Sequence, residues 1–312
     1  MDHAKSFSIQ EMIAEKQQKN RKKRLEKIIP FFLLLTAIVS VLTTLGIVFT
    51  LIVETFTFFD QVSMKEFLTA KKWYPFSETE GSFGILPLVS GTVKVTLISI
   101  IVAVPIGLAS AIYLSEYASD RTRRVIKPIL EVLAGIPTIV YGFFALTFVT
   151  PLLQKAIPSL EIFNALSPGI VMGVMIIPMI ASLSEDALSA VPYSMRQGAL
   201  ALGSTKFEVA LKVVVPAAMS GIIASIVLGI SRAIGETMIV AVAGGSTPNL
   251  DLNVTSSIQT MTAYIVQVSA GDAGYGSTIY YSIYAVGFTL FLFTLVMNLF
   301  AQFISRKFRE EY

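Results

Sequence analysis

Six apolar stretches divide this chain of 312 residues, and each is long enough to cross a lipid bilayer. A hydrocarbon core of about 30 Å needs about 20 apolar residues in helical conformation, and a spanning segment must satisfy its own backbone hydrogen bonds. Only 14% of the residues are charged, against roughly a quarter in soluble domains. We therefore predict an all-α integral membrane protein with six transmembrane helices, over residues 29–53, 86–114, 129–153, 168–190, 214–244 and 281–305.

The basic residues between these stretches predict the orientation, because cytoplasmic loops retain Lys and Arg. The two termini and the alternate loops on their side carry 18 Lys and Arg residues, whereas the loops on the other side carry four. Both termini are therefore expected in the cytoplasm. The two remaining cations, Lys94 and Arg232, lie inside predicted spans.

The spans also define the organisation of the chain. Residues 1–28 form a basic leader, 29–53 a first transmembrane anchor, 54–85 an extracytoplasmic loop, 86–305 a core of five helices with a cytoplasmic loop at 191–213, and 306–312 a cytoplasmic tail. The leader is too basic, and has no small-residue cleavage site, for a removable signal peptide. A basic cluster beside a span is typical of contact with anionic lipid, which we favour over nucleic-acid binding. Trp73 in the outer loop fits an interfacial aromatic or a docking surface.

The composition excludes several chemistries. The chain has no cysteine and a single histidine, His3, so disulfides, Cys/His metal sites and histidine-based catalysis have no residues to build them, and no cofactor is expected. The stretch "GALALGST", residues 198–205, imitates a phosphate-binding P-loop but lacks lysine directly after the second glycine. The chain is therefore not expected to hydrolyse ATP itself.

Several predicted spans are interrupted by helix-breaking or small residues, which fit a packed, mobile bundle better than independent anchors. These residues are Pro105, Gly107, Gly135, Pro137, Pro178, Gly229 and Gly235.

The loop at 191–213 predicts two short helices. Helix-favouring residues 196–202 are followed by Gly203, a helix stop, and residues 206–215 read as a second helix that leads into the membrane. A helix, a turn and a helix in the cytoplasm could serve as a lever for another protein.

This loop resembles the segment that permeases of ABC importers present to their ATPase. The family pattern is Glu-Ala-Ala, three residues, Gly, nine residues, an aliphatic residue, one residue and Pro. Here the motif is carried by Gln197, Gly198, Ala199, Gly203, Val213, Val215 and Pro216. The first two residues depart from the pattern, while the spacing to Gly203 and Pro216 is intact.

Further motifs extend the resemblance over roughly residues 70–305. They are "WYPFSETEGSFGILPLVSGTV", "AIYLSEYA", "AGIPTIVYGFFAL", "VMIIPMIASLSEDALSAVP" and "SRAIGETM". Together they are similar to the PstC-type permeases of bacterial phosphate ABC importers. The resemblance implies a type I importer permease with the MetI-like fold in the bacterial cell membrane. It also implies three partners: a related permease of the PstA type, cytoplasmic ATPase subunits and an extracytoplasmic phosphate-binding protein.

The motif "SRAIGETM" places Arg232 and Glu236 deep in the fifth span. An i to i+4 spacing puts both on one helix face, and charges at such depth generally face a bundle interior or an aqueous pathway. One interpretation is a station for anions, in which Arg232 attracts phosphate oxygens, Glu236 tempers that charge and Thr237 lies beside them. The alternative is a structural ion pair that holds helices together.

Lys94, about two turns inside the second span, is a weaker candidate for the pathway. A lysine at this depth can snorkel to lipid headgroups, and we favour that interpretation. Glu131, Glu185 and Asp186 lie near cytoplasmic ends of spans, where solvated or helix-tethering carboxylates are ordinary.

Three other functions remain open. A secondary transporter would need midplane carboxylates for ion coupling, and Glu236 is the only carboxylate deep in a span. An intramembrane enzyme would need a catalytic set that the spans do not contain. The third is a permease for another oxyanion, or the PstA-type partner itself.

Overall fold

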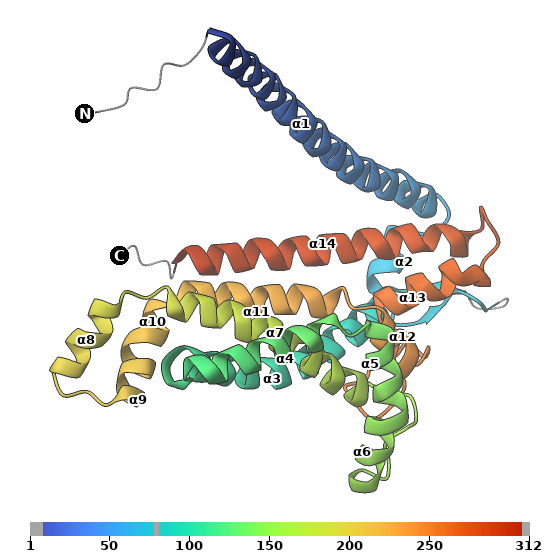
Figure 1. The fold of residues 1–312 in the computed structure, drawn as a ribbon. Helices are drawn as coiled ribbons and strands as arrows, with labels where there is room; N and C mark the ends of the chain where they lie inside the picture. The colour runs from blue at the N-terminus through green and yellow to red at the C-terminus, as the bar shows by residue number, and fades with distance from the viewer. Residues whose placement is uncertain (1–8, 78–80, 308–312) are drawn as a thin grey trace, which may run out of the picture. The chain divides into compact units, whose positions relative to one another are not determined.

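The computed structural model describes residues 9–77 and 81–307 (Figure 1). It divides into two compact units, residues 1–53 and 54–312. Residues 1–8 of the predicted leader and 308–312 of the predicted tail lie outside the described part. The first unit is the greater part of one long helix, α1 (Ile9–Phe59), whose apolar portion from Ile29 onward is long enough to cross a membrane.

Within its described residues the second unit is helical, with one small hairpin and four π-helical turns, labelled η. Its elements in chain order are α2 (Met64–Thr69), β1 (Trp73–Tyr74), β2 (Ser82–Phe83), α3 (Leu86–Ile112), η1 (Tyr113–Tyr117), α4 (Asp120–Gly135), α5 (Thr138–Phe144), η2 (Ala145–Val149), α6 (Thr150–Ala156), α7 (Leu166–Ser189), α8 (Tyr193–Ala201), α9 (Lys206–Val209), η3 (Ala210–Val214), α10 (Val215–Ala217), α11 (Met219–Ile234), α12 (Met238–Ala243), α13 (Met261–Gln267), η4 (Val268–Asp272) and α14 (Thr278–Lys307).

The number of membrane-spanning segments equals the six predicted from the sequence if one bent pair of helices counts as a single span. Within the described residues, five segments are long and apolar enough, namely Ile29–Phe59, Leu86–Tyr117, Thr138–Ala156, Leu166–Ser189 and Thr278–Ile304. A sixth would consist of Lys206–Ala217 and Met219–Ile234, which meet at an angle of 73°.

The third span begins later in the structure than the predicted range, residues 129–153, which was wrong at its start. Residues up to Gly135 belong to the amphipathic helix α4. Its N-cap is Ser119, whose hydroxyl accepts a hydrogen bond from the backbone N–H of Thr122 at 3.2 Å. The helix stops there because Pro137 disfavours helical conformation at Ile136 and has no N–H to donate. The spanning helix begins only at Thr138. The apolar run is continuous across this break, so hydropathy alone could not locate it.

The predicted fifth span, residues 214–244, is not one helix either. A bend at Ala218 separates α10 from α11, and α11 ends at Ile234, with Gly235 as its C-cap. By contrast, Pro105 and Pro178 lie inside α3 and α7 without ending them.

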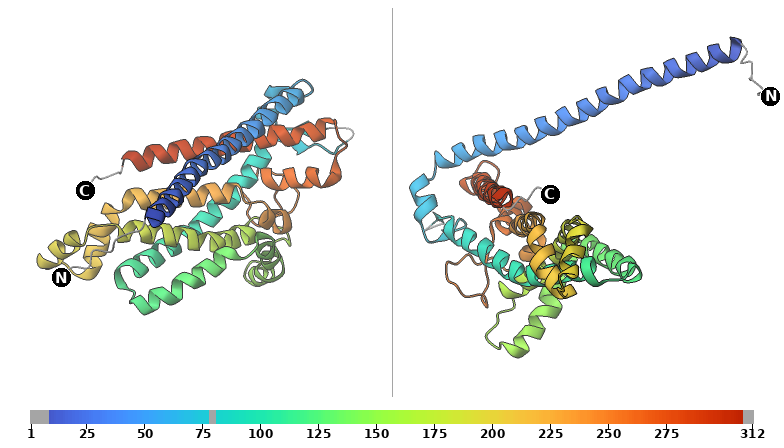
Figure 2. Two further views of the ribbon diagram at one scale, coloured as in Figure 1. Left: turned by 45° about the horizontal axis from the view of Figure 1, so that its top comes forward. Right: turned by 90° about the vertical axis from the view of Figure 1, so that its left-hand side faces the viewer.

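The core of the second unit is built where α3 and α7 run along each other (Figures 1 and 2). A Cβ atom on Gly107 of α3 would lie 2.9 Å from Ile180 Cγ2 of α7, so this crossing needs a glycine. The buried side chains around it include Met172, Ile176 and Ile180. The pair of α3 and α7 is therefore the central scaffold of the second unit.

The sequence predicts an interfacial or docking role for Trp73, and the structure contradicts this, because the side chain is buried. It is 1% exposed and packs edge-on against Phe83 and Tyr264, with ring centroids 5.8 and 4.9 Å apart. The β1–β2 pairing sets Trp73 opposite Phe83. The outer loop is thus anchored by a buried aromatic cluster, worth about 0.5–1.5 kcal/mol per ring pair beyond area burial.

Candidate functional site

The break between α11 and α12 holds the first group of predicted residues. Arg232 lies in the last turn of α11, where a cation interacts favourably with the helix dipole. Its side chain is exposed. Among the side chains that the structure describes, no hydrogen bond or ion pair within 4.0 Å involves the guanidinium.

Glu236 caps the helix that follows the break. Its Oε1 accepts hydrogen bonds from the backbone N–H groups of Met238 and Ile239 at 3.1 and 3.4 Å, as a carboxylate does at the first turn of a helix. Its backbone carbonyl accepts a bond from the hydroxyl of Thr262, on α13, at 2.8 Å. The Thr237 hydroxyl donates to the carbonyl of Gly235 at 3.2 Å. The break is therefore a fixed structure.

The expectation that Arg232 and Glu236 share one helix face is wrong, because α11 ends between them at Ile234. Glycine is a poor helix former and ends the helix readily. Within the described part of the chain, the six ion pairs include neither residue, so the two side chains are not bonded to each other in this conformation.

Lys94 does not snorkel, contrary to the interpretation favoured from the sequence. Its side chain is 8% exposed, and Nζ donates to Asn249 Oδ1 at 2.9 Å and to the carbonyl of Asp251 at 2.8 Å, with Asp251 Oδ1 at 3.4 Å. It thereby fastens the segment between α12 and α13 to α3. Sequence reasoning missed this because the partners lie more than 150 positions away.

The second group of predicted residues lies on α8, α9 and α10. Gln197, Gly198 and Ala199 are in α8, and Pro216 is in α10. Gly203 has φ +87°, a left-handed conformation that glycine adopts without strain, and it ends the α8 segment as the sequence predicts. The second predicted helix also forms, from Lys206 to Ala217, with the π-helical turn η3 inside it.

A capping box opens α9. The hydroxyl of Thr205 accepts the backbone N–H of Glu208 at 3.3 Å, and the Glu208 carboxylate accepts the backbone N–H of Thr205 at 3.1 Å. The two short helices also expose large apolar side chains at Tyr193, Leu200, Leu202 and Phe207.

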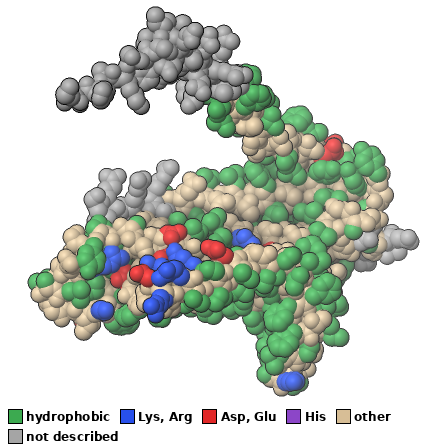
Figure 3. Space-filling model, viewed as in Figure 1, with side chains coloured by type: hydrophobic (Ala, Val, Ile, Leu, Met, Phe, Trp, Pro, Cys, Tyr) green, Lys and Arg blue, Asp and Glu red, His purple; other side chains and the backbone are tan. Residues whose placement is uncertain are grey.

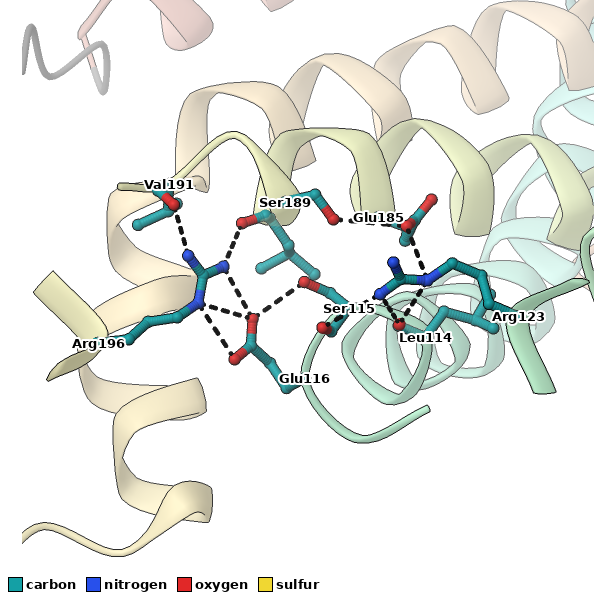
Figure 4. A network of polar contacts seen from close by, with 9 residues as sticks. Leu114, Ser115, Glu116, Arg123, Glu185, Ser189, Val191 and Arg196 are labelled. Atoms are coloured by element: carbon teal, nitrogen blue, oxygen red, sulfur yellow. Dashed lines mark hydrogen bonds and ion pairs between the residues drawn. The ribbon is translucent and has the colours of Figure 1, made fainter. Parts of the chain in front are cut away.

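Charged side chains gather toward the α8–α9 end of the bundle (Figure 3). Figure 4 shows two arginines there, Arg196 of α8 and Arg123 of α4, on either side of the end of α3. Lys127 of α4 forms ion pairs with Glu185 and Asp186 of α7, so these carboxylates tether helices as expected. Arg196 was not predicted as functional, although its partner Glu116 lies in the motif "AIYLSEYA". Among the described residues, no group of three or more His, Cys, Asp and Glu side chains could hold a metal ion.

A known family of membrane transport components matches these helices and segments. Residues 103–310 match the model of the family described as "Binding-protein-dependent transport system inner membrane component". The chain belongs to this family.

Relatives of known name agree with this assignment. The chain is 35% identical over 246 residues to the probable ABC transporter permease protein YqgH of Bacillus subtilis, covering 79% of both chains. It is 32% identical over 271 residues to the phosphate transport system permease protein PstC of Xylella fastidiosa, covering 79% of this chain and 82% of that one.

Solved structures share the fold at low sequence identity. A bacterial ABC transporter that imports alginate matches with a TM-score of 0.63 and 16% identity, over 92% of this chain and 100% of that one. The MetNI methionine ABC transporter, in an inward-facing conformation, matches with a TM-score of 0.53 and 17% identity, over 73% and 95%. These likenesses confirm the MetI-like type I importer fold predicted from the sequence.

Proposed function

We propose that this chain is a channel-forming permease subunit of an ATP-driven importer of inorganic phosphate. The observation that carries the proposal is the exposed guanidinium of Arg232 at a fixed break in a membrane span. A planar, permanently charged donor at this depth suits the oxygens of an oxyanion. The phosphate transport permeases among the relatives favour phosphate over other oxyanions.

The proposed recognition distinguishes phosphate from sulfate. Glu236 uses Oε1 to cap α12, and within the described contacts Oε2 is left to accept a hydrogen bond. Hydrogen phosphate offers a protonated oxygen at neutral pH, whereas sulfate does not. Glu236 also tempers the positive charge of Arg232, so that a bound anion can leave.

The proposed complex contains a second, PstA-type permease, cytoplasmic ATPase subunits that hydrolyse ATP, and an extracytoplasmic phosphate-binding protein. The α8–α9 segment would contact the ATPase, because its exposed Tyr193, Leu202 and Phe207 form an apolar surface with no need to face lipid. This arrangement puts both chain termini in the cytoplasm, in agreement with the distribution of Lys and Arg.

Reconstitution tests the proposal. The purified complex of this chain with the partner subunits, in lipid vesicles, should take up radiolabelled phosphate only with ATP and loaded binding protein, and should carry sulfate poorly. Equal uptake of sulfate would favour a permease for another oxyanion. Uptake driven by an ion gradient without ATP would favour a secondary transporter instead.

A further inference from the structure

Arg196 of α8 holds the end of two membrane-spanning helices with one guanidinium (Figure 4). Nη2 donates to the carbonyl of Leu188, in the last turn of α7, at 2.8 Å, and Nη1 donates to the carbonyl of Val191. Nη2 also bonds to Glu116 Oε1 at 3.0 Å, and Nε lies 3.3 Å from both oxygens of that carboxylate. A cation at a helix C-terminus satisfies carbonyls that lack partners within the helix.

Glu116 belongs to η1, the π-helical turn that continues α3. Its Oε1 also accepts the hydroxyl of Ser115 at 2.9 Å, which fixes the carboxylate in place. The side chains of Arg196 and Glu116 are 14% and 11% exposed, so water screens this ion pair little. Arg196 therefore connects α8 with the ends of both α3 and α7, the two helices of the central scaffold.

The connection matters because α8 is held loosely otherwise. No residue of α8 is buried, and Met195 and Ala199 only pack at the edge of a neighbouring apolar cluster. Among the described residues, Arg196 makes every side-chain hydrogen bond that α8 has. A hollow of about 570 Å³, lined in part by Tyr193, Arg196 and Lys206, leaves room for α8 to move.

We propose that Arg196 and Glu116 are the positioning pair that transmits movement of α8 to the spans α3 and α7. The inference rests on the proposed function, in which the α8–α9 segment contacts the ATPase. A displacement of α8 pulls on the Glu116 carboxylate and on the carbonyls of Leu188 and Val191 through one planar group. Because Glu116 and Leu188 lie on two different spans, the ends of both spans move with α8.

Arg123 provides a matched control, because it makes similar contacts at the same place without touching α8. From α4 it donates to the carbonyl of Leu114 at 2.7 Å and lies 3.8 Å from Glu185 of α7. Loss of Arg123 should therefore weaken the packing of the span ends but leave their connection to α8 intact.

The first experiment measures the phosphate imported per ATP hydrolysed in reconstituted complexes, normalised to assembled complex. Arg196→Ala should lower this ratio about tenfold, the factor for one charge-assisted hydrogen bond, and Arg196→Lys should restore it in part. Arg123→Ala should keep the wild-type ratio. If the pair were merely structural, Arg196→Ala would lower the amount of assembled complex and leave the ratio of phosphate to ATP unchanged. That result would overturn the proposal. An equal loss of the ratio in Arg196→Ala and Arg123→Ala would also overturn it.

The second experiment does not depend on transport. Because the chain has no cysteine, nitroxide labels can be attached at Leu202→Cys and Tyr117→Cys, at positions that are 89% and 45% exposed. In the full chain in lipid nanodiscs, Arg196→Ala should broaden the electron-spin distance distribution between the labels, whereas Arg123→Ala should not. An unchanged distribution would overturn the inference.

The proposed function and the proposed role of the Arg196–Glu116 pair can fail separately. A wild-type complex that moves no phosphate would defeat the proposed function, while the label distances would still test the pair. If Arg196→Ala does not accumulate, Glu116→Gln keeps the shape of the carboxylate, removes its charge and should move both readouts in the same direction.

Discussion

Within the described contacts the Glu236 carboxylate caps α12, whereas the Arg232 guanidinium has no bonded partner, so substitutions of the two residues should have different effects. Removal of Arg232 takes away the charge that attracts an anion and leaves Glu236 to repel it. Arg232→Ala should lower phosphate uptake roughly 30- to 150-fold, the equivalent of about 2–3 kcal/mol in lost charged hydrogen bonds. Arg232→Lys keeps the charge without the two-pronged geometry and should transport poorly. Uptake by assembled complexes in vesicles measures both.

Glu236→Gln keeps the cap of α12, since an amide oxygen can still accept the N–H groups of Met238 and Ile239. This variant should assemble normally, hold phosphate longer and turn over more slowly. Wild-type uptake by well-folded Arg232→Ala complexes would rule out the anion station. A loss of folded complex in either single variant would instead indicate that the residue stabilises the fold.

Lys94 lies in a buried cluster of hydrogen bonds, so its substitution should lower the stability of the folded protein. Lys94→Met leaves Asn249 Oδ1 and the Asp251 carbonyl without this donor, at a cost of about 1–3 kcal/mol. The melting temperature should fall by roughly 2–10 °C, measured by the fluorescence of Trp73, the single tryptophan. Lys155→Met on α6 is the control, because that lysine is exposed. Equal melting temperatures in the two variants would argue that Lys94 does not fasten the loop.

Among elements, the α8–α9 turn was the most predictable, because its signals are local. Gly203 follows a run of helix formers, and Thr205 with Glu208 three positions later is a capping box. The bends of the third and fifth spans were not predictable to the residue, since apolar composition continues through Pro137 and Gly235. The contacts of Trp73, Lys94 and Arg196 join segments far apart in the sequence, so they needed the fold.

Gly203 should tolerate no β-branched side chain. At φ +87° a residue other than glycine pays about 1–2 kcal/mol, and no atom within 4 Å would compensate. Gly203→Val should therefore shift or unwind the end of α8 and uncouple ATP hydrolysis from uptake while the protein still inserts. ATPase stimulation by loaded binding protein, measured together with uptake, tests this.

Gly276 is the matched control for this substitution, because it has φ +80° and also has no atom within 4 Å of an added Cβ. Gly276→Val imposes a similar backbone cost in the loop before α14, away from α8. It should lower stability without uncoupling. Normal coupling in Gly203→Val would contradict the assignment of α8 as the coupling segment.

At the scale of the whole molecule, the number of crossings depends on one bent segment. Five helices within the described residues can span a membrane by themselves, and the pair α9–α10 and α11, bent by 73°, makes the sixth. The distribution of Lys and Arg agrees with six crossings, because an even number puts both termini on the same side. A re-entrant α11 would instead return the chain to the side of α8.

Single cysteines placed in this cysteine-free chain distinguish the two topologies. Leu202, Leu252 and Tyr275 are each 89% exposed, and they lie respectively after α8, between α12 and α13, and before α14. In intact cells, a membrane-impermeant maleimide should label Leu252→Cys and Tyr275→Cys from outside and should reach Leu202→Cys only after the membrane is opened. If Leu252→Cys and Tyr275→Cys were both protected like Leu202→Cys, α11 would be re-entrant, because no described segment between residues 252 and 275 is long enough to cross the membrane. Arg232 would then lie in a loop that does not cross the membrane, and the proposed anion pathway would be contradicted.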